Sequence, residues 1–256
     1  TKISIASKIS GSFNNLTIDR LAVKMLASTS LSMQGNVKNL SDPDKMSMQV
    51  SLNRFFTTSK DIYTVLADSL IPASIQLPDS IELNGSFKGL VKAPTFSALL
   101  TTSSGNLKAN GKLDFRTTPS YSANVATNKL NLGKILKQPE TMGMLDMTAS
   151  VTGVGISMEE IQAKVDVSVS RLEYNKYEYN DFKINGSISK YLFSGEASMH
   201  DPNLDFTIKG DLDYTKESPI YTLEAYLANA DFQKLNLSQR PLKARGGFTV
   251  DLITSD

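Results

Sequence analysis

The sequence predicts an all-β protein with few short helices: an elongated, curved, mostly antiparallel sheet with an apolar groove, built of irregular repeats. Three observations predict this fold. Apolar and polar residues alternate along most of the chain, similar strand-and-turn blocks recur, and helical spacing appears only briefly. Alternation is typical of a strand with one dry and one wet face, whereas strands of a parallel α/β sheet are continuously apolar and separated by long helices.

Six runs show the alternation most clearly. The residues between their apolar members are mostly Ser, Thr, Lys, Asp and Asn, which we expect on the wet face. The apolar members are, in chain order, Ile3, Ile5 and Ile9; Met46, Met48, Val50 and Leu52; Ile81, Leu83 and Phe87; Leu107, Ala109, Leu113 and Phe115; Ile161, Ala163, Val165, Val167 and Val169; and Phe206, Ile208, Leu212 and Tyr214.

Helical spacing occurs in three short segments. Over residues 58–70 the apolar residues fall on one helical face, Thr58 or Ser59 is placed to cap the start, and Pro72 follows the end. Two shorter candidates are residues 132–136 and 232–237. Helices of one or two turns are not stable alone, so we expect them to cover an edge or an end of a sheet.

The chain contains an internal repeat. Residues 3–11, 81–89 and 145–153 share an alternating strand with small residues late in it, and residues 248–252 begin in the same way. The approximate blocks are 1–80, 81–143 and 144–247, with the start of another at 248. The third block holds an extra hairpin around residues 174–199. We expect one elongated β-domain over residues 1–256, as a piece of a larger protein.

The composition argues against several functional classes. The 27 Lys and Arg balance 26 Asp and Glu, so no excess of cations favours nucleic acid. The absence of Cys excludes disulfides and thiolate chemistry, and a single His excludes the three-ligand zinc sites. There is no signal-peptide pattern and no apolar run of about 18 residues for a membrane helix. We therefore expect no enzyme activity, no metal and no cofactor.

Residues that carry chemistry elsewhere lack partners here. His200 stands in a turn-like stretch, and Gly153 and Gly155 form only part of a nucleotide-binding glycine motif. Paired carboxylates occur at residues 159–160 and at 211 and 213, but nothing in the sequence selects a glycosidase pair.

Two basic clusters are candidate contact surfaces. The first mixes basic residues with tyrosines over residues 171–183, but acidic residues interrupt it, which favours a solvated hairpin over a nucleic-acid platform. The second is the run of Arg240, Lys243 and Arg245, which is either a site for anionic lipid headgroups or, more in keeping with its short length, a solvated loop.

An antiparallel sheet with one apolar face must hide that face, and three arrangements do so. A membrane barrel is disfavoured, because the chain has no Trp and no aromatic girdle. A dry β-sandwich is one alternative. The other is a sheet curved around its own apolar face, which small residues within strands favour.

The stretch at residues 81–115, IELNGSFKGLVKAPTFSALLTTSSGNLKANGKLDF, resembles the repeated block of AsmA-like proteins, the group that includes TamB. The shared pattern is an alternating strand with small residues, a crossing that contains Pro, and a strand with a central Gly. Residues 128–136, NKLNLGKIL, are similar to the family's junction between a strand and a short helix. The resemblance extends across the chain and rests on pattern and order.

This resemblance implies a periplasmic protein of diderm bacteria, anchored in the inner membrane by a helix outside this sequence. It implies a β-taco shape whose apolar groove carries phospholipid acyl chains between the inner and outer membranes, or supports outer-membrane assembly. The implied partners are phospholipid or another acyl lipid and outer-membrane assembly proteins, with no nucleic acid. The alternative is a β-sandwich scaffold or protein-interaction module with a dry core.

The residues expected to line the groove are the inward members of the alternating runs. They are Ile3, Ile5, Ile9, Met33, Val37, Met46, Met48, Val50, Leu52, Ile81, Leu83, Phe87, Leu107, Leu113, Phe115, Val125, Leu145, Met147, Val151, Val165, Val167, Val169, Phe206, Ile208, Leu212 and Leu223.

Overall fold

The computed structural model describes residues 2–66 and 70–253. It is all-β, with 66% strand and 5% helix, and its 16 strands form one antiparallel sheet that is not closed. The strand order follows the chain from β1 to β16, and only the short β11 lies off this path, paired with β10. The predicted all-β, antiparallel fold with few short helices is confirmed. All the described strands belong to one hydrogen-bonded sheet.

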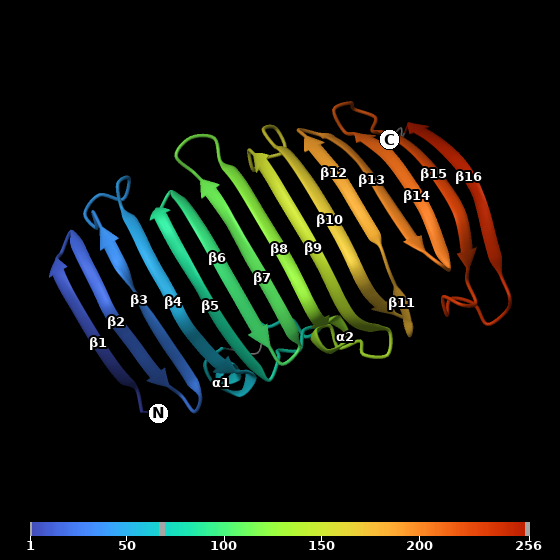
Figure 1. Cartoon of the computed structure of the whole chain (residues 1–256). Helices are drawn as coiled ribbons and strands as arrows, with labels where there is room; N and C mark the ends of the chain where they lie inside the picture. Colours follow the sequence, from blue (N-terminus) through green and yellow to red (C-terminus); the bar gives the residue numbers. More distant parts are fainter. Residues whose placement is uncertain (1, 67–69, 254–256) are drawn as a thin grey trace. The chain divides into compact units, whose positions relative to one another are not determined.

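The chain divides into two compact units, which are considered separately. The first unit comprises residues 1–117 and 127–138. Figure 1 shows its strands lying side by side in chain order. They are β1 (Ser4–Ser12), β2 (Asn15–Met25), β3 (Thr29–Lys38), β4 (Ser47–Thr58), β5 (Ser80–Leu90), β6 (Ala93–Thr102) and β7 (Gly105–Asp114), with helices α1 (Ser59–Val65) and α2 (Leu132–Ile135).

The second unit comprises residues 118–126 and 139–256, so β8 (Ser120–Asn131) contributes to both units. Its β12–β13 hairpin corresponds to the extra hairpin expected in the third block. The strands of this unit are β9 (Met142–Val154), β10 (Gln162–Tyr174), β11 (Tyr177–Tyr179), β12 (Phe182–Ser189), β13 (Leu192–Asp201), β14 (Leu204–Asp213), β15 (Ile220–Asp231) and β16 (Lys243–Ile253).

Bulges interrupt the pairing of several strands in the first unit. The register shifts between Ile18 and Leu21 where β2 pairs with β3, and between Leu52 and Phe55 where β4 pairs with β5. Each shift lets two apolar residues three positions apart face the same side, since the polar residues between them are taken up by the bulge. Bulges also increase the local right-handed twist of the strands.

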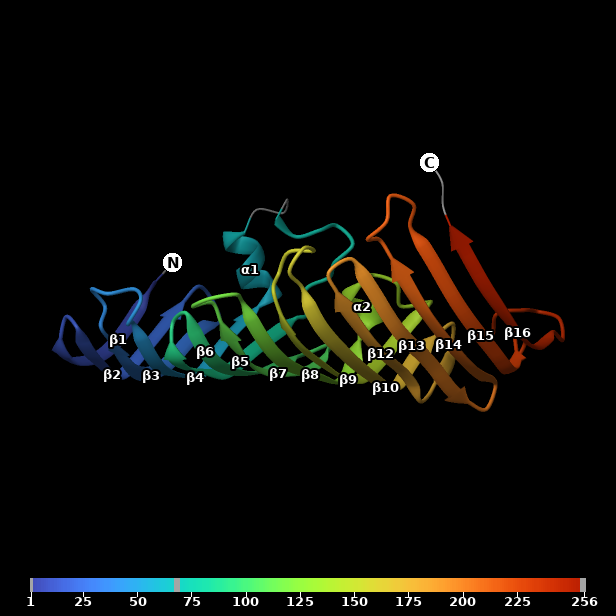
Figure 2. The same ribbon diagram turned by 90° about the horizontal axis from the view of Figure 1, so that it is seen from above.

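The helices match the predictions in part. Thr58 caps α1 and accepts a hydrogen bond from the Asp61 N–H, as expected, but the helix ends at Val65; residues 67–69 of the predicted segment lie outside the described residues. Asn131 caps α2, which confirms a helix near residues 132–136. Figure 2 shows α1 and α2 on the same side of the first unit's sheet.

The helix predicted over residues 232–237 is wrong. These residues form a turn closed by a hydrogen bond from the Leu235 N–H to the Asp231 carbonyl, and Asn236 has a φ of 57°. A left-handed residue ends a helical turn, so the segment stops after one turn. It connects β15 to β16.

Candidate functional site

One face of the first unit's sheet is apolar from strand to strand. Pairing places residues of consecutive strands in rows that cross the sheet, and each row stays on one face. One such row runs through Ile9, Ile18, Gly35, Val50, Phe87, Phe96 and Gly111. Another row on the same face, two rows away, runs through Ile5, Val23, Leu31, Phe55, Leu83, Leu100 and Leu107. The face therefore carries almost continuous hydrocarbon.

Most of the predicted groove residues of the first unit lie on this face. Three do not lie in a strand: Ile3 precedes β1, Met46 precedes β4 and Phe115 follows β7. The members that lie within strands are Ile5, Ile9, Met33, Val37, Met48, Val50, Leu52, Ile81, Leu83, Phe87, Leu107 and Leu113.

The predicted groove residues of the second unit share one face of its sheet. Tyr121 of β8 points to this same face, because its hydroxyl occupies the space that a side chain at Gly153 would fill. Val125 follows Tyr121 by four residues in the same strand. The remaining members are Leu145, Met147, Val151, Val165, Val167, Val169, Phe206, Ile208, Leu212 and Leu223.

Sequence reasoning missed the apolar residues that follow a bulge. Leu21 and Phe55 lie on the apolar face, but each is three residues after the previous inward residue and so is out of phase with it. The usable signal is the repeated pattern of an apolar residue, Asp or Asn, Arg and an apolar residue, which stands at residues 18–21 and again at 52–55.

Helix α1 lies over one end of the first apolar face and encloses a groove of about 370 Å³. Ile62 and Val65 of the helix line one side of the groove, and Val23, Leu31 and Phe55 of the sheet line the other. The groove is apolar except at its base, where α1 meets the turn between β2 and β3.

Asp61 fastens α1 to that turn. Its side chain is only 4% exposed, and its carboxylate accepts hydrogen bonds from the Ser28 N–H at 2.8 Å and the Thr29 hydroxyl at 2.8 Å. Burial raises the pKa of the Asp61 carboxyl, but the hydrogen bonds from Thr29, Ser28 and Ala27 outweigh it and hold the pKa below its usual value. Asp61 is therefore a structural anion rather than a reactive acid.

A row of three glycines crosses the apolar face of the second unit. Gly186 of β12 pairs with Gly195 of β13, which pairs with Gly210 of β14. Val165 of β10 pairs with Gly186 at one end, and Leu223 of β15 pairs with Gly210 at the other. The sheet has no side chains along this row, so a trough runs across the strands. We call the space above these glycines the glycine trough.

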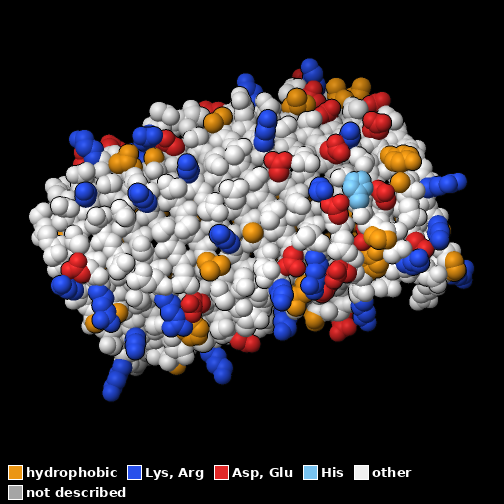
Figure 3. Space-filling view, viewed as in Figure 1, with side chains coloured by type: hydrophobic (Ala, Val, Ile, Leu, Met, Phe, Trp, Pro, Cys, Tyr) orange, Lys and Arg blue, Asp and Glu red, His pale blue; other side chains and the backbone are white. Residues whose placement is uncertain are grey.

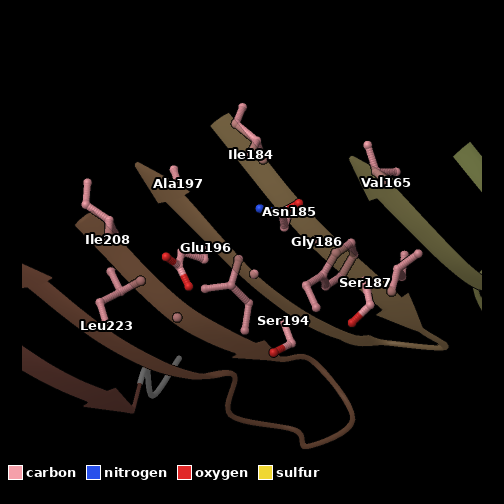
Figure 4. Close-up of a pocket in the computed structure, with 15 residues that line it drawn as sticks. Val165, Ile184, Asn185, Gly186, Ser187, Ser194, Glu196, Ala197, Ile208 and Leu223 are labelled. Atoms are coloured by element: carbon pink, nitrogen blue, oxygen red, sulfur yellow. The ribbon is translucent and has the colours of Figure 1, made fainter. Parts of the chain in front are cut away.

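Apolar side chains form both walls of the glycine trough. Ile184, Ala197 and Ile208 line one wall, and Figure 4 shows them side by side, with Val165 and Leu223 at the two ends. Ile188, Phe193 and Leu212 line the other wall. The volume enclosed is about 490 Å³. A cavity of this size falls within the range of small-molecule sites.

The other end of the second apolar face is covered by the chain itself. The turn at 232–237 places Leu235, which is 0% exposed, against Tyr179 and Met199. Leu172, Tyr177, Phe182, Leu204 and Phe206 pack around these residues. This cluster is the small closed core of the second unit, and Phe206, predicted as a groove residue, belongs to it rather than to the open part.

The opposite face of the sheet is polar. Arg54 contacts Glu82 at 2.9 Å, Lys209 contacts Glu196 at 3.4 Å, and Figure 3 shows a face with scattered charges and few hydrophobic side chains. The hydrogen bond from Arg54 lowers the pKa of the Glu82 carboxyl. Surface ion pairs of this kind contribute little to stability. The charges therefore serve mainly to keep this face of the sheet hydrated.

The candidate catalytic residues stand apart from one another. His200 Nδ1 lies 3.0 Å from Asp205 in an exposed pair, and Glu159 accepts a hydrogen bond from the Tyr191 hydroxyl at 2.7 Å. Gly155 directly follows β9 with a φ of 73°, and the turn there accounts for a glycine without a nucleotide. Among residues 2–66 and 70–253, no group of three or more His, Asp or Glu is arranged to hold a metal.

The predicted basic clusters are largely neutralised by acidic neighbours. Arg171 contacts Glu173, Glu178 and Asp146, so one guanidinium serves three carboxylates. In the second cluster, Lys243 lies 3.4 Å from Asp231. The solvated hairpin expected for the first cluster is only partly correct: Lys176 and Lys183 are exposed, but Tyr177 and Tyr179 pack in the closed core of the second unit.

Comparison of the chain with protein-family models, with characterised proteins and with solved structures finds no match. In the part of the chain that the structure describes, no helix is long and apolar enough to span a membrane.

Proposed function

We propose that the chain is a non-enzymatic, lipid-binding section of a periplasmic AsmA/TamB-like protein, which carries phospholipid acyl chains along an apolar groove between the inner and outer membranes or supports outer-membrane assembly. One observation carries the proposal: the sheet of each unit has an apolar face, and no second sheet among the described strands covers it. The family assignment rests on the resemblance of residues 81–115 and 128–136.

The limited burial of the chain supports an apolar face that is available to a ligand. The chain exposes 15968 Å² of accessible surface. A compact folded protein of 27.9 kDa exposes about 11,000 Å² by the usual scaling with mass. Among the described residues, Leu235 is the only large side chain that is fully buried. Much hydrocarbon therefore remains accessible in the two units.

The chemistry of the two faces suits an acyl lipid. Transfer of an alkyl chain out of water is favourable by about 0.8 kcal/mol per CH₂, so a chain can be held without specific polar contacts. A charged headgroup is costly to bury and has to stay in water, beyond the apolar face.

The proposal is tested by native mass spectrometry and lipid extraction of the purified chain. We expect bound phospholipid in the wild type. In Phe87→Ser, which removes a ring from the apolar face of β5, we expect less bound lipid. The matched control is Lys88→Ser at the next residue, on the polar face, which should keep the wild-type amount. A lipid-free wild type that also takes up no lipid from vesicles contradicts the proposal.

A further inference from the structure

We infer that the glycine trough is a length-limited seat for one unbranched acyl chain of a phospholipid, and that the side chain of Leu223 is its stop. This inference rests on the proposed function and deepens it, since it places the chain at a particular site and gives that site a limited length. Four features of the trough carry it: its floor, its length, its closed end and its lack of charge.

The floor allows close approach of a narrow ligand. Gly186 has open space where a side chain would stand, since the nearest atom to a Cβ built there is the Ser194 carbonyl oxygen at 3.7 Å. Gly195 continues the bare floor into β13. A chain lying here contacts backbone below it and apolar side chains on both flanks, which gives dispersion contacts on three sides.

The length of the trough matches one acyl chain. Because the Leu223 side chain lies over Gly210, the open floor runs from Val165 of β10 to Gly210 of β14, which is three strand spacings or about 14 Å at about 4.8 Å per spacing. The hydrocarbon core of a bilayer is about 30 Å thick, so one acyl chain occupies about 15 Å of it. An extended chain that crosses the strands above the glycines therefore fits between Val165 and the side chain of Leu223.

Leu223 closes one end of the trough. A Cβ at Gly210 would collide with Leu223 Cδ2, so the leucine side chain leans over the last glycine of the row. Val250 of β16 pairs with Leu223 and continues the row with another branched side chain. The bare floor therefore ends at β14 and does not continue as a channel through β15.

The charges near the trough favour an uncharged ligand. Lys164 and Asp166 flank Val165 in sequence, and Lys209 and Asp211 flank Gly210, but all four border a separate hollow on the polar face. Glu196 is paired with Lys209 there. A ligand on the apolar side of the glycine row therefore contacts mainly hydrocarbon. This surface complements an acyl chain and offers no partner to a charged group.

The trough suits a polypeptide poorly. Backbone N–H and C=O groups of an interior strand are paired within the sheet, so an extended peptide lying across the face finds no partners for its own backbone. A helix is about 10 Å wide. The walls stand four residues apart along each strand, about 13 Å between Cα atoms, and the side chains of Ile184, Ile188 and Leu212 narrow this further.

The test measures binding of lysophosphatidylcholines with lauroyl, myristoyl and palmitoyl chains, below their micellar concentrations, by isothermal titration calorimetry. Gly186→Val fills the floor and should weaken binding of the myristoyl lipid at least tenfold. The matched control is Ser189→Val, an exposed residue on the polar face of the same strand and outside the trough lining, which should stay within twofold of wild type. Circular dichroism checks that each variant keeps its strands.

Leu223→Ala gives a second, independent readout because it removes the stop. Each buried CH₂ contributes about fourfold in affinity and palmitoyl has two more than myristoyl, so the preference for palmitoyl over myristoyl should rise by about 15-fold relative to wild type. The inference about the trough is wrong, and the proposed function stands, if the wild type binds these lipids while Gly186→Val has no effect and Leu223→Ala does not change the preferred chain length. No binding of any of these lipids by the wild type overturns the proposed function as well.

Discussion

Replacing Leu235 with alanine tests the closed core of the second unit. Leu235 is 0% exposed and packs against Tyr179 and Met199, each 6% exposed. A buried Leu→Ala change removes hydrocarbon contacts and leaves a cavity, at a cost of about 2–5 kcal/mol. Because few other residues of this unit are buried, we expect a loss of about 3 kcal/mol in the free energy of unfolding.

Urea unfolding followed by tyrosine fluorescence measures this loss, since Tyr177 and Tyr179 belong to the cluster and the chain has no Trp. The matched control is Leu237→Ala in the same turn, where the leucine is 46% exposed and the expected loss is about 1 kcal/mol or less. Equal losses in the two variants, or a loss below about 1 kcal/mol for Leu235→Ala, would refute the reasoning that this turn seals a core.

Three further predictions concern charge and backbone. Burial raises the pKa of the Asp61 carboxyl, but its hydrogen bonds outweigh burial and lower the pKa below the usual 3.8. The ionised carboxylate therefore stabilises the fold fully above pH 3.8, and this contribution is lost as the pH falls through the lowered pKa. In Asp61→Asn we expect the melting temperature to fall less steeply in acid than in the wild type. Gly105→Ala should destabilise by about 2 kcal/mol in urea unfolding, because φ is +114° and Leu130 Cα lies 2.6 Å from the new Cβ, whereas Gly186→Ala should change stability by less than about 0.5 kcal/mol. The hydrogen bond from Arg116 lowers the pKa of Asp114 to about 2, so NMR titration of Arg116→Ala should show the Asp114 midpoint rising toward 3.8.

The strands were predictable because their alternation has a direct physical cause. Residues such as Val165 and Val167 repeat every second position without interruption, and the structure keeps them on one face of β10. The helix that begins at Ser59 was predictable from its cap and its helical spacing, and the one that begins at Leu132 from its spacing alone. A run that alternates cleanly and a helix with a good cap need only local information.

The glycine trough was not predictable from single strands. Gly186, Gly195 and Gly210 each read as an ordinary small residue within an alternating run. These glycines form a row only in the register in which β12, β13 and β14 pair. That register depends on the turns between the strands, which the alternating pattern of a single strand does not specify. The closed core was missed for a similar reason, because Leu235 lies in a turn whose position over Tyr179 depends on tertiary packing.

The strand order, which follows the chain from β1 to β16 apart from β11, bears on how such a protein gains or loses length. Each strand finds its partners among its immediate neighbours in sequence, so pairing requires only short loop closures, which favours fast formation of hairpins. Removal or insertion of two strands leaves every later strand running in its original direction. Removal of one strand reverses all that follow. The hairpin is therefore the natural unit of change in this chain.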